Sequence, residues 1–144
     1  MDIAQFKFRF DLQMRWNDLD ALGHVNNAMF ITYFETARGR FMLEACPGWD
    51  WYKNMFLIAQ VHADFQKELL LSAKNPQVLM RTSKIGTKSF ELSYAIISEG
   101  KEGTVLHATG TTTQIMFDMN TRQTIVIPSW VKENLIDFDA WRES

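Results

Sequence analysis

The chain has 144 residues, of which 47% are hydrophobic and 13% aromatic, so one domain spanning residues 1–144 with a sizeable core is expected rather than a disordered chain. A net charge of −2 offers no basic surface for duplex nucleic acid, and binding to nucleic acid is therefore not expected. No apolar run reaches the roughly 18–20 residues of a membrane span, and the N-terminal residues show no export signal, so a cytoplasmic location is expected.

The first predicted element is a strand. Apolar and polar residues alternate strictly over residues 6–16, as in a strand with one buried face. The segment NDLDALGH that follows is rich in turn-forming residues and predicts a loop. Asn26 or Asn27 can then cap a helix that runs to about Ala45. Its apolar residues recur at helical spacing: Phe30, Tyr33, Phe34, Ala37 and Phe41. Other apolar residues lie off this stripe, so the helix is expected to be embedded in protein.

After the Pro47-Gly48 break the chain is mostly strand-like. Strands are predicted at about 57–68, 78–84, 88–98 and 104–117, with turn signals between them, then a short strand at 124–127. Ser129 can cap a brief closing helix. This order predicts an α+β domain of the hotdog fold, in which an antiparallel sheet of about five strands wraps around one long central helix. Such a sheet leaves an open edge, which predicts a homodimer or homotetramer.

Two carboxylates, Asp18 and Asp20, stand in the loop before the long helix. The unpaired N–H groups and the dipole at a helix N-terminus create a positive potential that suits a developing oxyanion. A carboxylate in the preceding loop can address the same carbon atom. This combination indicates chemistry at an acyl carbonyl.

Three motifs in this region carry a family resemblance. They are DLDALG at 18–23, HVNN at 24–27 and FETAR at 34–38. Together they resemble the hotdog thioesterases of the 4-hydroxybenzoyl-CoA thioesterase type and their bacterial acyl-CoA hydrolase relatives, with Phe30 where many relatives have Tyr. The segment KSFE at 88–91 resembles the part of that family near coenzyme A. Plant acyl-carrier-protein thioesterases are also similar through HVNN, but Leu22 stands where they have a catalytic Asn.

The resemblance implies an acyl-CoA thioesterase that releases a free acid and CoA. By the same likeness Asp20 is catalytic, either as the nucleophile or as the general base, and the backbone N–H near Asn27 binds the carbonyl oxygen. No cofactor is implied, because coenzyme A is part of the substrate. An acyl carrier protein is an alternative acyl donor. A non-catalytic acyl-CoA binding module and a hydratase of enoyl thioesters are the other interpretations.

The remaining site candidates each have two interpretations. Asp18 either orients its neighbours or contacts the substrate. His24 orients the carboxylate, polarises water, or merely packs. Glu35 either reaches the site or forms an ion pair with Arg38 at three-residue spacing.

Lys84 and Lys88 flank the turn at Gly86, and the KSFE motif adds Ser89. Their ammonium groups could meet the phosphates of coenzyme A, or they could belong to a solvated hairpin. Cys46 has no basic neighbours and is expected to be inert, and one cysteine with three scattered histidines predicts no metal site. His62 and His107 are expected to be ordinary sheet residues. An aromatic cluster lies after the helix and is either an acyl pocket or core: Trp49, Trp51, Tyr52 and Phe56.

Overall fold

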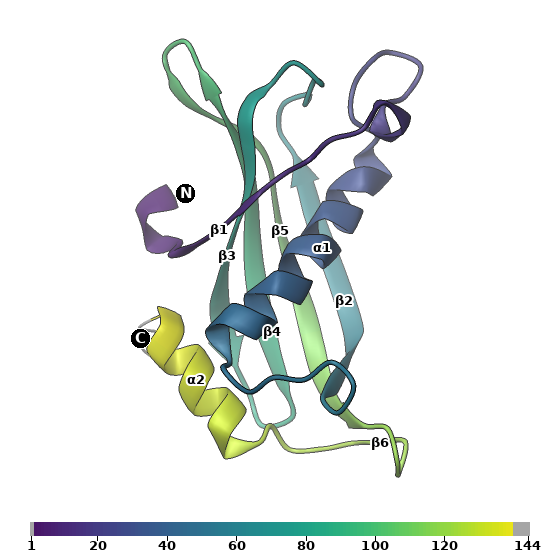
Figure 1. The fold of residues 1–144 in the computed structure, drawn as a ribbon, viewed down its shortest axis with the longest axis vertical. Helices are drawn as coiled ribbons and strands as arrows, with labels where there is room; N and C mark the ends of the chain where they lie inside the picture. Colours follow the sequence, from purple (N-terminus) through teal and green to yellow (C-terminus); the bar gives the residue numbers. More distant parts are fainter. Residues whose placement is uncertain (1, 140–144) are drawn as a thin grey trace.

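In the computed structural model, which describes residues 2–139, one long helix lies across the concave face of a curled antiparallel sheet (Figure 1). The helix is α1 (Asn27–Ala45). The strands are β1 (Phe8–Asp11), β2 (Met55–Phe65), β3 (Lys74–Ile85), β4 (Ser89–Gly100), β5 (Gly103–Asp118) and β6 (Gln123–Thr124). Their order in the sheet is β1-β3-β4-β5-β2, with β6 pairing with β5. The predicted α+β hotdog architecture is confirmed.

The boundaries and the depth of α1 follow from particular residues. Asn26 caps the helix, because its side chain accepts a hydrogen bond from the N–H of Ala28 (2.9 Å). Phe34 is completely buried against β5. A side chain at Gly110 of β5 would place a Cβ atom 2.5 Å from the Phe34 ring, so only glycine allows the helix this close to the sheet.

The first strand is much shorter than the alternation over 6–16 predicts. Only Phe8–Asp11 pairs with β3, and the last bond of this edge runs from the N–H of Leu12 to the carbonyl of Pro76 (2.9 Å). Proline has no N–H to continue the ladder. The chain then turns into a 3-10 helix, η2 (Trp16–Asp18), where the Trp16 side chain is 77% exposed. A second 3-10 turn, η1 (Ile3–Gln5), precedes β1.

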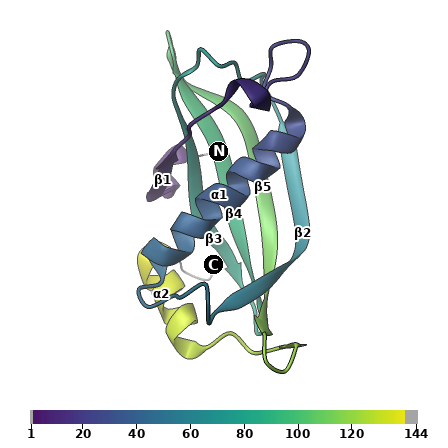
Figure 2. The same cartoon turned by 45° about the vertical axis from the view of Figure 1, so that its right-hand side comes forward.

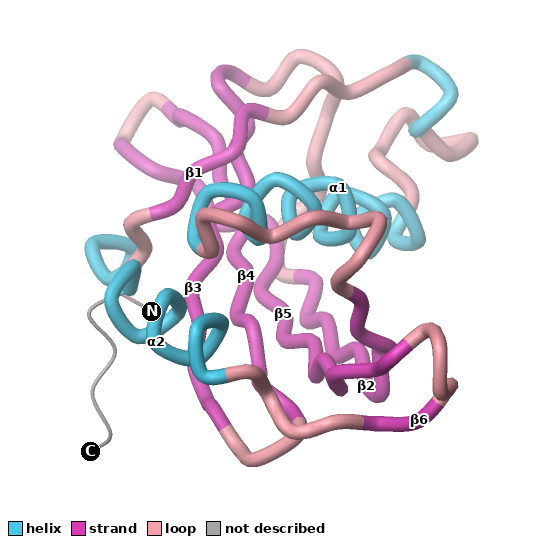
Figure 3. Tube along the Cα trace, turned by 60° about the horizontal axis from the view of Figure 1, so that its bottom comes forward, coloured by secondary structure: helices cyan, strands magenta, loops and turns pink. Residues whose placement is uncertain are grey.

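The C-terminal elements also differ in length from their predictions. The strand expected over 124–127 is reduced to the two residues of β6, and the closing helix, α2 (Ser129–Asp139), is longer than the brief helix expected. Figure 3 shows α1 running along the inside of the curled sheet, with α2 beside β3. No helix within residues 2–139 is long and apolar enough to cross a membrane.

The strand β2 forms an open edge of the sheet. Within residues 2–139 it pairs with β5 on one side only, and Figure 2 shows its other side free along its whole length. Most of its 11 residues are exposed, including the apolar side chains of Leu57, Ile58, Val61 and Phe65. A long, apolar, unpaired edge strand is a template for pairing with another strand.

Candidate active site

The loop that contains Asp20 is closed by its own hydrogen bonds. The N–H of Asp20 donates to the carbonyl of His24 (2.7 Å), and Asp20 Oδ1 accepts from the N–H groups of Leu22 (2.9 Å) and His24 (3.2 Å). Gly23 has a φ of 78°, the left-handed conformation this tight turn requires. Asp20 Oδ2 accepts no hydrogen bond from any described residue, so one carboxylate oxygen is free for chemistry.

The N-terminus of α1 presents one unpaired donor beside this carboxylate. The N–H of Ala28 donates to the Asn26 side chain and that of Met29 to the Asn26 carbonyl (2.8 Å). The N–H of Asn27 makes no hydrogen bond within residues 2–139. Asp20 and Asn27 both line a pocket of about 340 Å³. The other residues lining this pocket are His24, Val25, Phe30, Phe65, Gln66, Lys67 and Glu68. The residue with the free carboxylate oxygen and the residue with the unpaired helix N-terminal N–H therefore line one cavity.

The two further catalytic candidates are placed differently. His24 is half-buried and lines the same pocket as Asp20. Glu35 is exposed on α1, two turns beyond the helix start, and does not line that pocket. Its ion pair with Arg38, one of the two interpretations, is not formed, because the Arg38 side chain is buried and donates instead to the hydroxyl of Tyr94 (3.2 Å).

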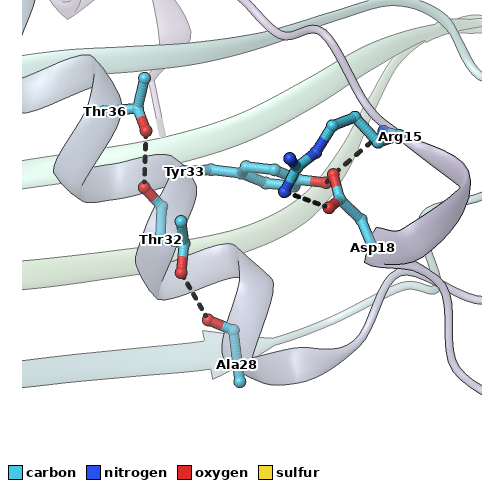
Figure 4. Close-up of polar contacts among 6 residues, drawn as sticks. All are labelled: Arg15, Asp18, Ala28, Thr32, Tyr33 and Thr36. Carbon is cyan, nitrogen blue, oxygen red and sulfur yellow. Dashed lines mark hydrogen bonds and ion pairs between the residues drawn. The ribbon is translucent and has the colours of Figure 1, made fainter.

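Asp18 does not line this pocket and is buried, with 1% of its surface exposed. Asp18 Oδ2 accepts hydrogen bonds from the Tyr33 hydroxyl (2.7 Å) and the Arg15 N–H (3.0 Å), while Oδ1 pairs with the Arg15 guanidinium (3.3 Å; Figure 4). Burial alone would raise the pKa of Asp18, but the bonds from Tyr33 and Arg15 and the Arg15 charge outweigh it, so the pKa is lowered. Burial and the bond to Asp18 raise the pKa of Tyr33. This group fastens the loop to α1.

A family model described as the thioesterase-like superfamily matches residues 14–135, a span that includes the Asp20 loop, α1 and the strands β2 to β5. The chain belongs to the thioesterase-like superfamily. A search of curated proteins gave no match.

Solved structures share the fold of this thioesterase-like chain. A thioesterase from Thermus thermophilus, complexed with coenzyme A and Zn, is 26% identical, with a TM-score of 0.82 over 96% of this chain and 98% of the other. A thioesterase-superfamily protein from Jannaschia is 22% identical, with a TM-score of 0.83 over 94% and 84% of the two chains. The probable thioesterase YbaW from Escherichia coli is 22% identical, with a TM-score of 0.71 over 88% and 95%.

Lys84, Lys88 and Ser89, the residues predicted to contact coenzyme A, lie far from the Asp20 pocket within this chain. Phe65, in the Asp20 pocket, pairs with Ala108 of β5, whereas Ser89 pairs with Ile115. Seven residues of strand separate these positions, which is roughly 23 Å. Lys84 and Ser89 line a different pocket of about 280 Å³, and Lys88 is exposed at the adjoining turn. The structure does not bring the two groups together within one chain.

His107 holds the segment 66–68, which forms one wall of the Asp20 pocket. Its Nδ1 lies 3.0 Å from the carbonyl of Glu68, and its Nε2 lies 2.7 Å from the Ser98 hydroxyl. Its own carbonyl accepts from the N–H groups of Gln66 and Lys67. The prediction of a satisfied sheet histidine is confirmed, and burial lowers its pKa. Its role in holding this wall was missed, because its partners lie about 40 residues earlier and no local pattern marks them.

The other singled-out residues lie outside the pocket. Cys46 is buried, and burial raises the pKa of its thiol to about 12, as expected for an inert cysteine. His62 is exposed and pairs with Asp64 (3.0 Å). No group of three or more metal-ligating side chains occurs in the described part of the chain. Trp49 is buried after the C-terminal end of α1 against Trp51 and Phe56, whereas Tyr52 is almost fully exposed and takes no part.

Proposed function

We propose that this thioesterase-like protein hydrolyses an acyl-CoA thioester to a free carboxylic acid and CoA, with Asp20 as the catalytic carboxylate. The observation that carries the proposal is the shared pocket of the free Asp20 Oδ2 and the unpaired Asn27 N–H. Membership in the superfamily and the likeness to a thioesterase complexed with coenzyme A add support. The motifs around Asp20 favour the 4-hydroxybenzoyl-CoA thioesterase type.

The proposed chemistry uses both groups on one carbonyl. The carbonyl oxygen of the thioester accepts a hydrogen bond from the Asn27 N–H. The α1 dipole stabilises the negative charge that develops on this oxygen during the reaction. Asp20 then either attacks the carbonyl carbon, forming an anhydride that water cleaves, or takes a proton from the water that attacks it. In both routes the C–S bond breaks, CoA leaves as the thiolate, and the acid is released. His24 in the same pocket is placed to orient the carboxylate or water.

We further propose that the working unit is a homodimer, or a tetramer built from it, in which two β2 edges pair antiparallel. The open apolar edge of β2 supports this arrangement. Antiparallel pairing brings the Asp20 end of one subunit beside the β3–β4 turn of the other. Lys84 and Lys88 of the partner subunit, with Ser89 of the partner subunit, would then meet the phosphates of coenzyme A. A dimer would thus bring together two ends of the sheet that are roughly 23 Å apart along β5 in one chain.

The test is release of free thiol from a panel of aliphatic and aromatic acyl-CoAs, and from the matching acyl-carrier-protein thioesters. Hydrolysis of at least one acyl-CoA, faster than that of its carrier-protein counterpart, is expected. Preference for the carrier protein would identify that protein as the acyl donor. Tight binding of acyl-CoA without any thiol release would contradict the hydrolase and identify a binding module.

We also propose that this enzyme works in the cytoplasm. Its single cysteine, Cys46, is buried and cannot form a disulfide within the chain, which fits a reducing compartment.

A further inference from the structure

Arg38 is a buried cation without a counter-charge among residues 2–139. Only 9% of its surface is exposed, and its guanidinium donates to the Tyr94 hydroxyl (3.2 Å). No carboxylate of residues 2–139 lies within ion-pair distance of it. A buried charge that lacks a partner is costly, so such side chains are normally paired. Residues 2–139 therefore do not supply the missing negative charge.

The groups beneath Arg38 hold its position but do not neutralise it. Tyr94 shares a hydrogen bond with the hydroxyl of Thr112 (2.6 Å), which in turn donates to the side chain of Gln114. Thr112 and Gln114 are uncharged. Burial raises the pKa of Tyr94, so its hydroxyl is protonated as well. This network fixes the guanidinium under α1 and supplies no anion.

Glu35, three residues before Arg38 on the same helix, is an anion without an ion-pair partner among residues 2–139. Its side chain is exposed. Ile31, Glu35, Arg38 and Met42 follow the 4-3-4 spacing of a helix–helix seam, which places them along one flank of α1. Ile31 is also exposed on this flank, whereas Met42 is completely buried and belongs to the core.

The flank that carries this seam faces the open β2 edge. On the opposite side of α1, Tyr33 reaches Asp18 in the loop that follows β1. On the seam side, the Trp51 indole donates to the carbonyl of Gly39 (3.3 Å) and its ring packs on Phe56 of β2. The seam and β2 therefore border the same side of the fold.

Apolar residues of β2 continue this surface. Val61 pairs with Thr112, and Ile58 pairs with Gln114. Residues directly opposite each other in a sheet point to the same face, so Val61 and Ile58 point toward α1. They are 41% and 37% exposed. A strip of exposed apolar side chains thus runs along the open edge, with the exposed Glu35 and the buried Arg38 beside it, and neither charge is paired within residues 2–139.

We propose that a second copy of this chain covers this strip, and that Glu35 of each subunit forms an ion pair with Arg38 of the other. A two-fold interface presents the same patch twice, so a surface with one anion and one cation is complementary to itself. Each dimer then contains the ion pair twice. This inference rests on the β2 pairing proposed above, but not on the hydrolytic activity.

Two charge reversals test the pair between subunits rather than within one. Glu35→Arg leaves only positive charges at the two positions, and Arg38→Glu leaves only negative charges. Each variant alone is expected to dimerise at least about 30-fold more weakly than wild type, because like charges face each other across the axis. Mixing the two variants should restore a heterodimer with wild-type affinity, measured by analytical ultracentrifugation. An ion pair inside one chain cannot be rescued by mixing.

The matched controls are Arg40→Glu and Glu44→Arg, exposed charges on the other side of α1, which should leave the dimer dissociation constant unchanged. Circular dichroism establishes that each variant is folded. Should Arg38→Glu fail to fold, Arg38→Gln and Glu35→Gln replace the reversals, and each should weaken the dimer at least about tenfold.

The outcomes separate this proposal from the proposed function. A dissociation constant within about twofold of wild type for the folded Glu35 variants would overturn the ion pair while leaving β2 pairing intact. A failure of the mixture to form heterodimers would do the same. A wild-type monomer at micromolar concentration would overturn both the ion pair and the β2 pairing, and thiol release would still test hydrolysis independently. An Arg38→Gln variant that dimerises normally but loses affinity only for acyl groups ending in a carboxylate would overturn the ion pair in favour of a substrate anion.

Discussion

Asp18 and Asp20 stand two residues apart in one loop, yet their surroundings are opposite. Asp18 is buried and accepts hydrogen bonds from Tyr33 and Arg15. Asp20 is exposed at a pocket and keeps one oxygen free. Asp18 thus holds the loop against α1 through its hydrogen bonds, whereas Asp20 is the candidate catalytic residue. In a motif with two carboxylates, one side chain can therefore hold the loop in place while the other stays available for chemistry.

Apart from a change at Asp20 itself, the largest loss of kcat is expected from removing the unpaired N–H of Asn27. Asn27→Pro deletes this donor, and proline is favoured at the first position of a helix. Asn26 already has the extended backbone that precedes proline (φ −60°, ψ 137°). We expect kcat for thiol release to fall on the order of 10²–10³-fold, as for loss of one oxyanion-hole donor. Asn27→Ala keeps the N–H and should remain active, whereas equal losses in both variants would contradict the oxyanion role.

Asp18→Asn should affect stability more than chemistry. It removes the charge that accepts bonds from Tyr33 and Arg15, and hydrogen bonds to a charged group contribute about 1.5–3 kcal/mol each. A loss of about that size in the free energy of unfolding is expected from urea titration. The kcat of the folded variant should stay much closer to wild type than that of a variant at Asp20. A stable but inactive Asp18→Asn protein would reverse the division between the two carboxylates.

The stability that Asp18 contributes to the folded protein should depend on pH. Because the pKa of Asp18 is lowered in the folded state, the unfolded chain takes up a proton first as the pH falls below its ordinary value of about 3.9. The stabilisation by Asp18 is therefore present at neutral pH and lost in acid. Asp18→Asn should lose less stability than wild type on acidification, as measured by urea unfolding at each pH. Parallel curves for the two proteins would show that Asp18 does not carry this effect.

How much of this arrangement the sequence predicts depends on how local each interaction is. The ends of α1 were predicted well, because Asn26 and the aromatic spacing act within a few residues. The first strand was predicted too long, because its limit is set by Pro76, more than sixty residues away. The opposite orientations of Asp18 and Asp20 could not be predicted, since they depend on contacts with Tyr33 and with the carbonyl of Leu69, which accepts from Val25. Local signals thus predicted the candidate residues, and distant partners determined their burial and hydrogen bonds.

The smallest effect is expected at the opposite end of the sheet. Lys84→Glu and Lys88→Glu should raise KM for acyl-CoA up to about fivefold each, with kcat nearly unchanged, as for loss of exposed charge pairs worth about 0.2–1 kcal/mol. The same variants should not change KM for a short thioester that lacks the nucleotide. Unaltered KM for acyl-CoA in both variants would place the nucleotide elsewhere.

The most direct measurement is kcat of Asp20→Asn for thiol release at saturating acyl-CoA. The asparagine oxygen can still accept the bonds from Leu22 and His24 that close the loop, so folding and substrate binding should be retained. The negative charge needed for attack or for water activation is lost, and kcat should fall on the order of 10²–10⁴-fold. A variant that keeps more than about a tenth of wild-type kcat would contradict catalysis by Asp20 and leave His24 as the next candidate.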